Sequence, residues 1–208
     1  MEKEEVKKVL IKSVVIGSSR VGKTALINNF VTSKFSQNYK VTIGADFFTK
    51  EIDIGKNVKV ALQMWDTAGQ EKYASLGRSF YHGAESCVIV FDITDIQSFE
   101  KLDFWKHQFL EEMIFDSKDF PFVVIGSKVD LESERRVPSQ KALQWCKENG
   151  NLPYFEISSK QSINIAEAFQ CISTTAYSYH CKHASLITLP QTKLKKRKKK
   201  PSAEICKC

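Results

Sequence analysis

The chain has 208 residues, of which 42% are hydrophobic, so its length and composition allow one globular domain with a substantial core and a short tail. No apolar run approaches the roughly 18 residues that would cross a bilayer, and the charged N-terminus lacks the core of a signal peptide. We therefore expect a protein that is made and kept in the cytosol. The net charge of +7 lies entirely in residues 193–208, which hold eight basic residues and Glu204. Residues 1–192 are formally neutral, which argues against a nucleic-acid-binding domain.

Apolar runs alternate with helical patterns along the chain, which predicts a parallel sheet covered by helices. The expected strands are Ser13–Ile16, Phe47–Ile54, Val58–Trp65, Cys87–Asp92, Phe122–Ile125 and Tyr154–Ile157. The expected helices are Lys23–Thr32, Gln70–His82, Ser98–Phe115, Ser139–Glu148 and Asn164–Tyr179. A hairpin-like turn at residues 55–57 joins the second and third strands, so one edge of the sheet should be antiparallel.

Residues 17–24 match the phosphate-loop pattern, with the sequence Gly-Ser-Ser-Arg-Val-Gly-Lys-Thr between a predicted strand and a predicted helix. In such a loop, backbone N–H groups and the helix N-terminus contact phosphate oxygens. Lys23 would reach the outer phosphates, and the Thr24 hydroxyl would bind Mg²⁺. The alternative is a chance match on a surface turn, which the strand–loop–helix setting disfavours.

Polar residues follow three other predicted strands, at the ends where open parallel sheets bind their ligands. An acidic residue such as Asp66, at the end of a strand near a phosphate loop, suits a magnesium contact through water. Thr42 lies in a polar loop between the first helix and the second strand. The three polar segments are Asp66-Thr67-Ala68-Gly69-Gln70-Glu71, Ser127-Lys128-Val129-Asp130 and Ser158-Ser159-Lys160.

With these motifs in this order, the whole chain resembles the Rab family of small GTPases, in the Ras superfamily. Residues 39–47 and 65–71 are similar to Rab switch regions, and Thr42–Glu51 and Ser75–Gly83 most resemble the late-endosomal Rab-seven branch. The resemblance implies a three-layer α/β fold of the P-loop GTPase type, with a six-stranded, mostly parallel sheet, one antiparallel edge strand and five helices. It also implies a GTP-binding domain over residues 1–180 and a flexible polybasic tail over residues 181–208.

The resemblance assigns roles to single residues. Lys23 and Gln70 would be catalytic, because Lys23 holds the outer phosphates and Gln70 orients the attacking water. Mg²⁺ would be bound by Thr24, Thr42 and, through water, Asp66. The residues expected to bind GTP or GDP are Gly17, Ser18, Ser19, Arg20, Val21, Gly22, Lys23, Thr24, Ala25, Phe35, Tyr39, Thr42, Gly69, Ser127, Lys128, Asp130, Ser158, Ser159 and Lys160.

The guanine base should lie against Phe35, edge-on, and under the stem of Lys128. The Ser159 amide would meet the base carbonyl oxygen, and the Gly69 amide would meet the γ-phosphate. The Asp130 carboxylate would accept hydrogen bonds from the guanine ring N–H and amino group. Its role also follows from chemistry, because a carboxylate repels the acceptor that adenine presents at this edge. This disfavours the rival interpretation as a P-loop ATPase or kinase.

The loops around Thr42 and residues 69–73 should be ordered by the γ-phosphate and Mg²⁺ and should relax after hydrolysis. Hydrolysis should be slow in the isolated protein, because no stabilising arginine in cis is recognisable at the γ-phosphate. The residue types alone leave open whether the aromatic members of the expected effector surface are ordinary core residues. That surface comprises Ile43, Phe47, Trp65, Tyr73 and Phe80.

Three residues of the site depart from the family pattern. Ser18 stands where Rabs usually carry Asp, which should matter little. Arg20 replaces a glycine and would cost roughly 1–2 kcal/mol if its φ is positive. Ser127 replaces the Asn of the Asn-Lys-x-Asp motif and is too short both to brace the base and to tie its loop to the phosphate loop. Losing hydrogen bonds of about 1 kcal/mol each should speed nucleotide exchange. The alternative is a scaffold that has lost nucleotide binding.

The basic run at residues 193–201 alone is compatible with a solvated tail, a nuclear import signal or a nucleic-acid contact. The chain ends in Ile205-Cys206-Lys207-Cys208, which is not a C-a-a-X box. It matches the Cys-x-Cys ending on which Rabs receive two geranylgeranyl groups. We therefore expect lipidation of Cys206 and Cys208, with the basic run against an anionic membrane surface.

The resemblance also implies partners and a location. We expect an exchange factor, a GTPase-activating protein, a dissociation inhibitor, a prenylation escort protein and effectors, but no nucleic acid, and a monomeric protein. The location would be the cytoplasmic face of late endosomes and lysosomes, with a soluble pool in the cytosol. Cys87, Cys146 and Cys171 should be buried thiols rather than zinc ligands.

Overall fold

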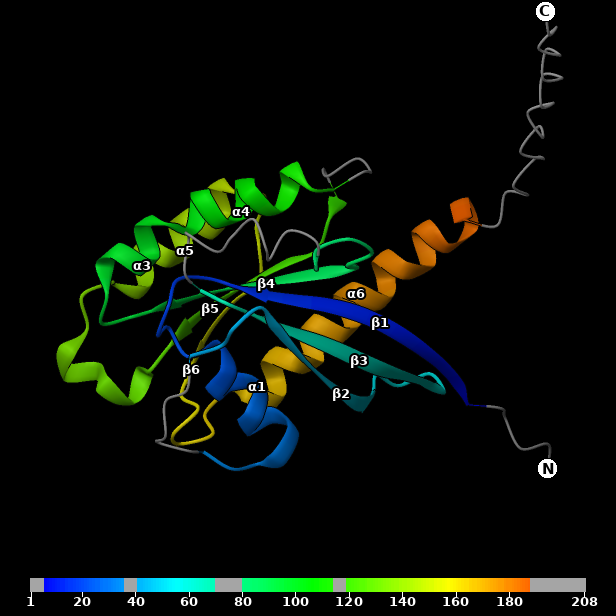
Figure 1. Ribbon diagram of the computed structural model, residues 1–208, viewed down its shortest axis with the longest axis horizontal. Helices are drawn as coiled ribbons and strands as arrows, with labels where there is room; N and C mark the ends of the chain where they lie inside the picture. The colour runs from blue at the N-terminus through cyan, green and yellow to red at the C-terminus, as the bar shows by residue number, and fades with distance from the viewer. Residues whose placement is uncertain (1–5, 36–40, 70–79, 114–118, 188–208) are drawn as a thin grey trace, which may run out of the picture.

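A central sheet lies between two layers of helices in the computed structural model, which describes residues 6–35, 41–69, 80–113 and 119–187 (Figure 1). The strand order is β2-β3-β1-β4-β5-β6. Only the β2–β3 pair is antiparallel, so the predicted mostly parallel sheet with one antiparallel edge strand is confirmed. The strands are β1 Lys7–Ile16, β2 Ala45–Asp53, β3 Val58–Thr67, β4 Ser86–Asp92, β5 Phe122–Ser127 and β6 Tyr154–Ile157.

The described part of the chain contains five α-helices, α1 and α6 on one face of the sheet and α3, α4 and α5 on the other (Figure 1). A 3-10 helix, η3 Val129–Glu134, follows β5. The α-helices are α1 Lys23–Thr32, α3 Ile96–Glu100, α4 Leu102–Glu111, α5 Ser139–Glu148 and α6 Ile165–Ile187.

Two helices differ from their predicted bounds, and one lies mostly beyond the described residues. The helix predicted at 98–115 is two helices that meet at Lys101, and the first begins earlier because the Asp95 side chain caps it by accepting from Gln97 N at 3.0 Å. Helix α6 continues past its predicted end at Tyr179. The predicted domain boundary at 180 thus falls within this helix and stays a prediction. Most of the helix predicted at 70–82 is outside the described residues.

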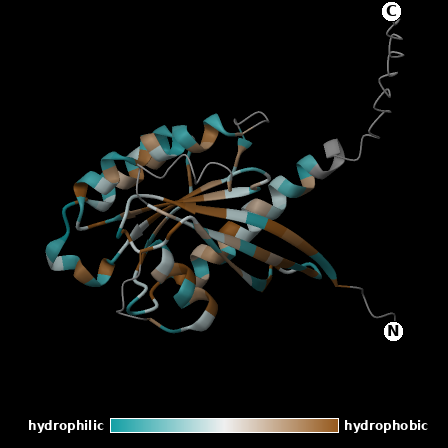
Figure 2. Cartoon of the chain, viewed as in Figure 1, coloured by the Kyte–Doolittle hydropathy of each residue, from teal (hydrophilic) through white to brown (hydrophobic). Residues whose placement is uncertain are grey.

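Apolar side chains form a core on each face of the sheet, and the hydrophobic colour in Figure 2 concentrates in the central strands. All seven residues of β4 are buried, as expected for a central parallel strand that helices cover on both faces. On the α1–α6 face, Phe30 stacks on Phe169 with ring centroids 3.8 Å apart. This contact fixes α1, whose N-terminus carries the phosphate loop, against α6.

The cysteines follow the prediction in part. Cys87 and Cys146 are buried, and burial raises the pKa of both thiols, that of Cys146 to about 11. Cys171 is only half-buried. In the portion of the chain that the structure covers, no group of three His, Cys, Asp or Glu side chains could hold a metal, and no helix is both long and apolar enough to span a bilayer.

Candidate nucleotide-binding site

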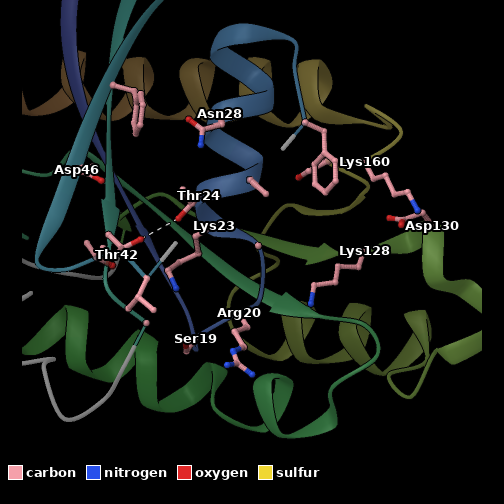
Figure 3. Close-up of a pocket in the computed structure, with 18 of the residues that line it drawn as sticks. Ser19, Arg20, Lys23, Thr24, Asn28, Thr42, Asp46, Lys128, Asp130 and Lys160 are labelled. Atoms are coloured by element: carbon pink, nitrogen blue, oxygen red, sulfur yellow. Dashed lines mark hydrogen bonds between the residues drawn. The ribbon is translucent and has the colours of Figure 1, made fainter. Parts of the chain in front are cut away.

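A cavity of ≈ 780 Å³ opens at the carboxyl end of the sheet, and most of the predicted nucleotide-binding residues surround it (Figure 3). Those that line it are Ser19, Arg20, Gly22, Lys23, Thr24, Ala25, Phe35, Thr42, Gly69, Lys128, Asp130, Ser159 and Lys160. Others are buried residues outside this lining, namely Gly17, Ser18, Val21, Asp66, Ser127 and Ser158. The further residues that line it, which the sequence did not predict, are Asn28, Val41, Asp46, Phe48, Thr67 and Leu131.

The phosphate loop connects β1 to α1 in a conformation that only glycine allows at two points. A Cβ on Gly17, with φ at 139°, would lie 2.2 Å from the Val90 carbonyl oxygen of β4. Gly22 has φ at 98° and starts α1. Within the described residues, α1 has neither a side-chain cap nor an acidic residue in its first turn. Its first N–H groups therefore remain available for an anion such as a phosphate.

Lys23 extends from the first turn of α1 into the loop and is almost fully buried. Its Nζ donates to the carbonyl oxygens of Gly17 at 2.7 Å and Ser18 at 2.9 Å. Burial lowers the pKa of Lys23 to about 8, although the nearby Asp66 carboxylate opposes this shift. A Cβ on Gly69 would lie 2.4 Å from the same Nζ, so the start of the predicted second switch passes directly over the amine.

Three oxygen ligands meet beside Lys23, at the predicted magnesium site. The Thr24 hydroxyl donates to Asp66 Oδ2 at 2.5 Å, the Thr42 hydroxyl to the same atom at 3.3 Å, and the two hydroxyls are 3.2 Å apart (Figure 3). Asp66 Oδ1 is buried and has no hydrogen-bond partner among the described residues. Burial raises the pKa of Asp66, against the opposing effects of the Thr24 hydrogen bond and Lys23. Hydroxyl and carboxylate oxygens around an unsatisfied buried acceptor fit a hydrated Mg²⁺.

The other end of the cavity holds the residues predicted to bind the base. Lys128 has a left-handed backbone, φ 67°, and its Nζ pairs with Asp92 Oδ2 at 2.5 Å. Asp130 Oδ1 accepts a hydrogen bond from the Ser158 hydroxyl at 2.6 Å. Phe35, which is 40% exposed, also lines the cavity. Figure 3 shows Lys128, Asp130 and Lys160 gathered here, away from the Thr24–Thr42 pair.

The three departures from the family pattern each have a structural counterpart. Arg20 has φ at 65°, so the condition under which it strains the loop is met. The Ser127 hydroxyl is buried 2.5 Å from the Val21 carbonyl oxygen and 2.9 Å from that of Phe91, with one hydrogen to donate. Serine thus ties its loop to the phosphate loop but is not among the cavity's lining residues. Ser18 accepts a hydrogen bond from the Trp105 Nε1 of α4 at 3.3 Å.

Known proteins match this chain over most of its length. A model described as the Ras family matches residues 12–178. The chain is 50% identical over 171 residues to "Ras-related protein Rab-7a" of Dictyostelium discoideum, which is 82% of this chain and 84% of the relative. It is 46% identical over 203 residues to "Ras-related protein Rab-7a" of Paramecium octaurelia, or 97% and 98% of the two chains. It is 50% identical over 173 residues to "Ras-related protein RABG3a" of Arabidopsis thaliana, which is 82% of this chain and 84% of the relative.

The chain belongs to the Rab branch of the Ras family. It is therefore a small GTPase that binds guanine nucleotide and hydrolyses GTP, and regulators and effectors act with it, as with other Rabs. A nucleotide-insensitive scaffold is not favoured by this membership.

The aromatic residues predicted for the effector surface of this Rab lie against one another, with Phe47 exposed and Trp65 and Phe80 half-buried. The ring centroids of Phe47 and Trp65 are 5.7 Å apart, and those of Trp65 and Phe80 are 5.5 Å apart. Phe47 is 61% exposed and Ile43 is 90% exposed, so neither is a core residue. The other predicted residues, Tyr39, Gln70, Tyr73, Cys206 and Cys208, are outside the described residues.

Some lining residues of the Rab site had a signal in the sequence. Asn28 lies four residues after Thr24 on α1, hence on the same helix face, and Leu131 follows Asp130 directly. Asp46 had no such signal. It faces the cavity because it pairs with Asp66 across the β2–β3 ladder, and this register is a property of the folded hairpin.

The lowered pKa of Lys23 predicts that nucleotide binding takes up a proton. At pH 8 about half of the nucleotide-free protein lacks this proton, and a bound phosphate favours the ammonium form and raises the pKa again. Because the bound state then holds more protons, the affinity for GDP should fall as the pH rises through 8. Calorimetry in two buffers of different ionisation enthalpy should show uptake of about half a proton at pH 8 and roughly a tenth at pH 7. No uptake at pH 8 would contradict the prediction.

Proposed function

We propose that this Rab protein is a membrane-anchored GTP/GDP switch in vesicle traffic toward late endosomes and lysosomes. The observation that carries the proposal is one cavity with two chemically different ends. One end gathers Lys23, Thr24 and Thr42 around the start of α1, and the other gathers Lys128 and Asp130 beside the loop after β6. The distinct chemistry of the two ends suits a ligand with phosphates at one end and a base at the other. The Rab-7 names of several relatives support the choice of the late-endosomal route.

At the phosphate end, Lys23 would hold the outer phosphates, and Thr24, Thr42 and, through water, Asp66 would hold Mg²⁺. When bound, the ion would neutralise charge on the phosphate oxygens. Gln70 would orient the attacking water, and the Gly69 N–H would contact the γ-phosphate. The intrinsic reaction would be slow, and an activating protein that supplies an arginine would accelerate it by roughly 10³–10⁵.

The switch would follow from contacts that exist only while the γ-phosphate is present. Thr42 and Gly69 belong to the two predicted switch regions, and both line the cavity. Loss of the γ-phosphate would release both segments, which lead into the patch formed by the exposed Ile43 and Phe47 and the half-buried Trp65. Effectors at this patch would thereby distinguish the GTP-bound from the GDP-bound protein. An exchange factor would return the protein to the GTP-bound state.

At the base end, Phe35 and the Lys128 stem would enclose the guanine ring. The Ser159 amide would donate a hydrogen bond to the guanine carbonyl oxygen, and the Asp130 carboxylate would accept hydrogen bonds from the guanine ring N–H and amino group. The geometry around Asp130 supports this role. The Ser158 hydroxyl occupies only one carboxylate oxygen and so orients the carboxylate while leaving acceptor capacity free.

Replacement of Asp130 by Asn tests the guanine assignment. The variant should bind GDP about 10- to 100-fold more weakly, because the Asn oxygen can still accept one hydrogen bond but its amide donor faces the guanine amino group, so one hydrogen bond to a charged group, roughly 1.5–3 kcal/mol, is lost. It should bind xanthosine diphosphate better than the wild type does, because xanthine presents a carbonyl in place of the amino group and the Asn amide can donate to it. Competition against a fluorescent nucleotide measures both affinities. Equal loss for both nucleotides would contradict the base contact.

Arg20 and Ser127 lead us to propose that this Rab releases nucleotide faster than the family pattern allows. The Ser127 hydroxyl has one hydrogen for two carbonyl oxygens, whereas an Asn amide in its place would carry two. Ser127→Asn should therefore slow the release of fluorescent GDP by about tenfold, the effect of one added hydrogen bond. Ser127→Ala should speed release, because the Val21 carbonyl loses its donor. Equal release rates for wild type and Ser127→Asn would rule the idea out.

The C-terminal tail would anchor the protein on the cytoplasmic face of the membrane. Geranylgeranyl groups on Cys206 and Cys208 would provide a stable anchor, because a single lipid chain binds a membrane only marginally and two hold the protein there. The basic run at 193–200 would add attraction to anionic lipids. An escort protein would present the chain for prenylation, and a dissociation inhibitor would hold the soluble pool. Replacing both cysteines by Ser should release the protein from membranes, as fractionation would show; unchanged membrane association would contradict lipid anchoring.

A further inference from the structure

Asn29, on the face of α1 turned away from the solvent, joins two distant parts of the nucleotide site. Its side chain is only 5% exposed. Its Nδ2 donates to the Ser159 carbonyl oxygen at 2.8 Å and to the Ser162 hydroxyl at 2.9 Å, across 130 and 133 residues of sequence. Both N–H donors of the amide are thus used within the loop that follows β6.

The loop at 158–163 is a closed turn with two anchor points. Ser158 and Ile163 exchange backbone hydrogen bonds of 3.3 and 3.0 Å, and the Ser158 hydroxyl accepts from Gln161 N at 3.0 Å. One anchor is the hydrogen bond from the Ser158 hydroxyl to Asp130. The other is Asn29. The second anchor links this loop to α1, the helix that also carries Lys23 and Thr24.

We propose that Asn29 is a positioning residue that fixes the base-binding loop at 158–163 on the phosphate-binding helix α1. The distance between the two ends of the nucleotide site would thereby stay constant. Asn29 follows Thr24 by five residues, which is about 7.5 Å along a rigid helix axis. The Ser159 carbonyl that Asn29 holds belongs to the same residue as the N–H proposed to meet the guanine carbonyl oxygen. The inference therefore rests on that proposed contact.

The physical reason for this role is the burial of Asn29. A buried carbonyl without its donor is costly, so the Ser159 peptide has one strongly preferred position while the Asn29 amide is present. Without the amide, the peptide unit between Ser159 and Lys160 is free to turn toward water. The Ser159 N–H lies in the preceding peptide unit, which is joined to this one at the Ser159 Cα, so it would be held less firmly at the base.

The test compares GDP with 6-thio-GDP, in which sulfur replaces the base carbonyl oxygen and accepts hydrogen bonds weakly. Full-length wild-type protein should bind GDP more tightly than the thio analogue. Asn29→Ala should weaken GDP binding about tenfold, the equivalent of about 1.4 kcal/mol. It should weaken binding of 6-thio-GDP only about twofold to threefold, because that ligand makes little use of the Ser159 N–H. The discrimination between the two nucleotides should therefore fall.

Asn149→Ala is the matched control. The Asn149 side chain also makes two hydrogen bonds, to Trp145 O at 3.0 Å and from Lys106 Nζ at 2.8 Å, but it follows α5 and is not among the lining residues of the cavity. It should change neither affinity. If Asn29→Ala does not fold, as judged by circular dichroism, Ser162→Ala removes one of the two acceptors and should reduce the discrimination in the same direction by a smaller factor.

Two outcomes contradict different statements. If the wild type does not distinguish the two nucleotides, the proposed contact between Ser159 and the base is wrong. If the wild type distinguishes them and folded Asn29→Ala keeps the full ratio, only the inference about Asn29 is overturned. If Asn29→Ala loses affinity equally for both nucleotides, the ratio is unchanged and the inference about Asn29 is likewise overturned, because the loss would then be a general structural effect.

Discussion

The close approach of the phosphate loop to β4 is the constraint on which the rest of the site depends. Because the Gly17 position has no room for a Cβ beside the Val90 carbonyl, the loop turns sharply at the end of β1 and delivers α1 with its N–H groups toward the cavity. Neighbouring elements then hold this turn in place. Ser127 donates to the Val21 carbonyl from β5, and Trp105 donates to Ser18 from α4. The loop is thus held by the sheet and by the helix layer that contains α4.

Two buried charges beside the loop make the protein responsive to its ligands. Burial disfavours both the ammonium of Lys23 and the carboxylate of Asp66, and each only partly compensates the other. Lys23 uses carbonyl oxygens of the loop as acceptors, and one Asp66 oxygen has no partner among the described residues. Phosphate and a hydrated cation would satisfy these two groups together. Nucleotide binding would therefore relieve an electrostatic cost that the fold builds in.

The departures from the family pattern act on the positioning of the site rather than on its ligands. Arg20 adopts a left-handed backbone in the loop, and Ser127 keeps only the link to the phosphate loop. Neither removes a group that would bind phosphate or cation. Binding of guanine nucleotide is thus compatible with both changes. Asn29 adds a separate link between the phosphate-binding helix α1 and the loop after β6.

The amino-acid sequence by itself located all six strands, because apolar runs with polar residues at their ends are typical of buried strands, although β1 begins at Lys7 rather than at the predicted Ser13. It also located the phosphate loop and Asp130 by residue type and spacing. The tertiary structure decided how these segments act together. Asp46 faces the cavity only through the β2–β3 register, and Asn29 reaches Ser159 only because α1 packs beside the loop after β6. The sequence contains no glycine or proline near Lys101 that would predict the break between α3 and α4. The positions of Asp46 and Asn29 depend on contacts between residues far apart in the chain, which no local pattern records.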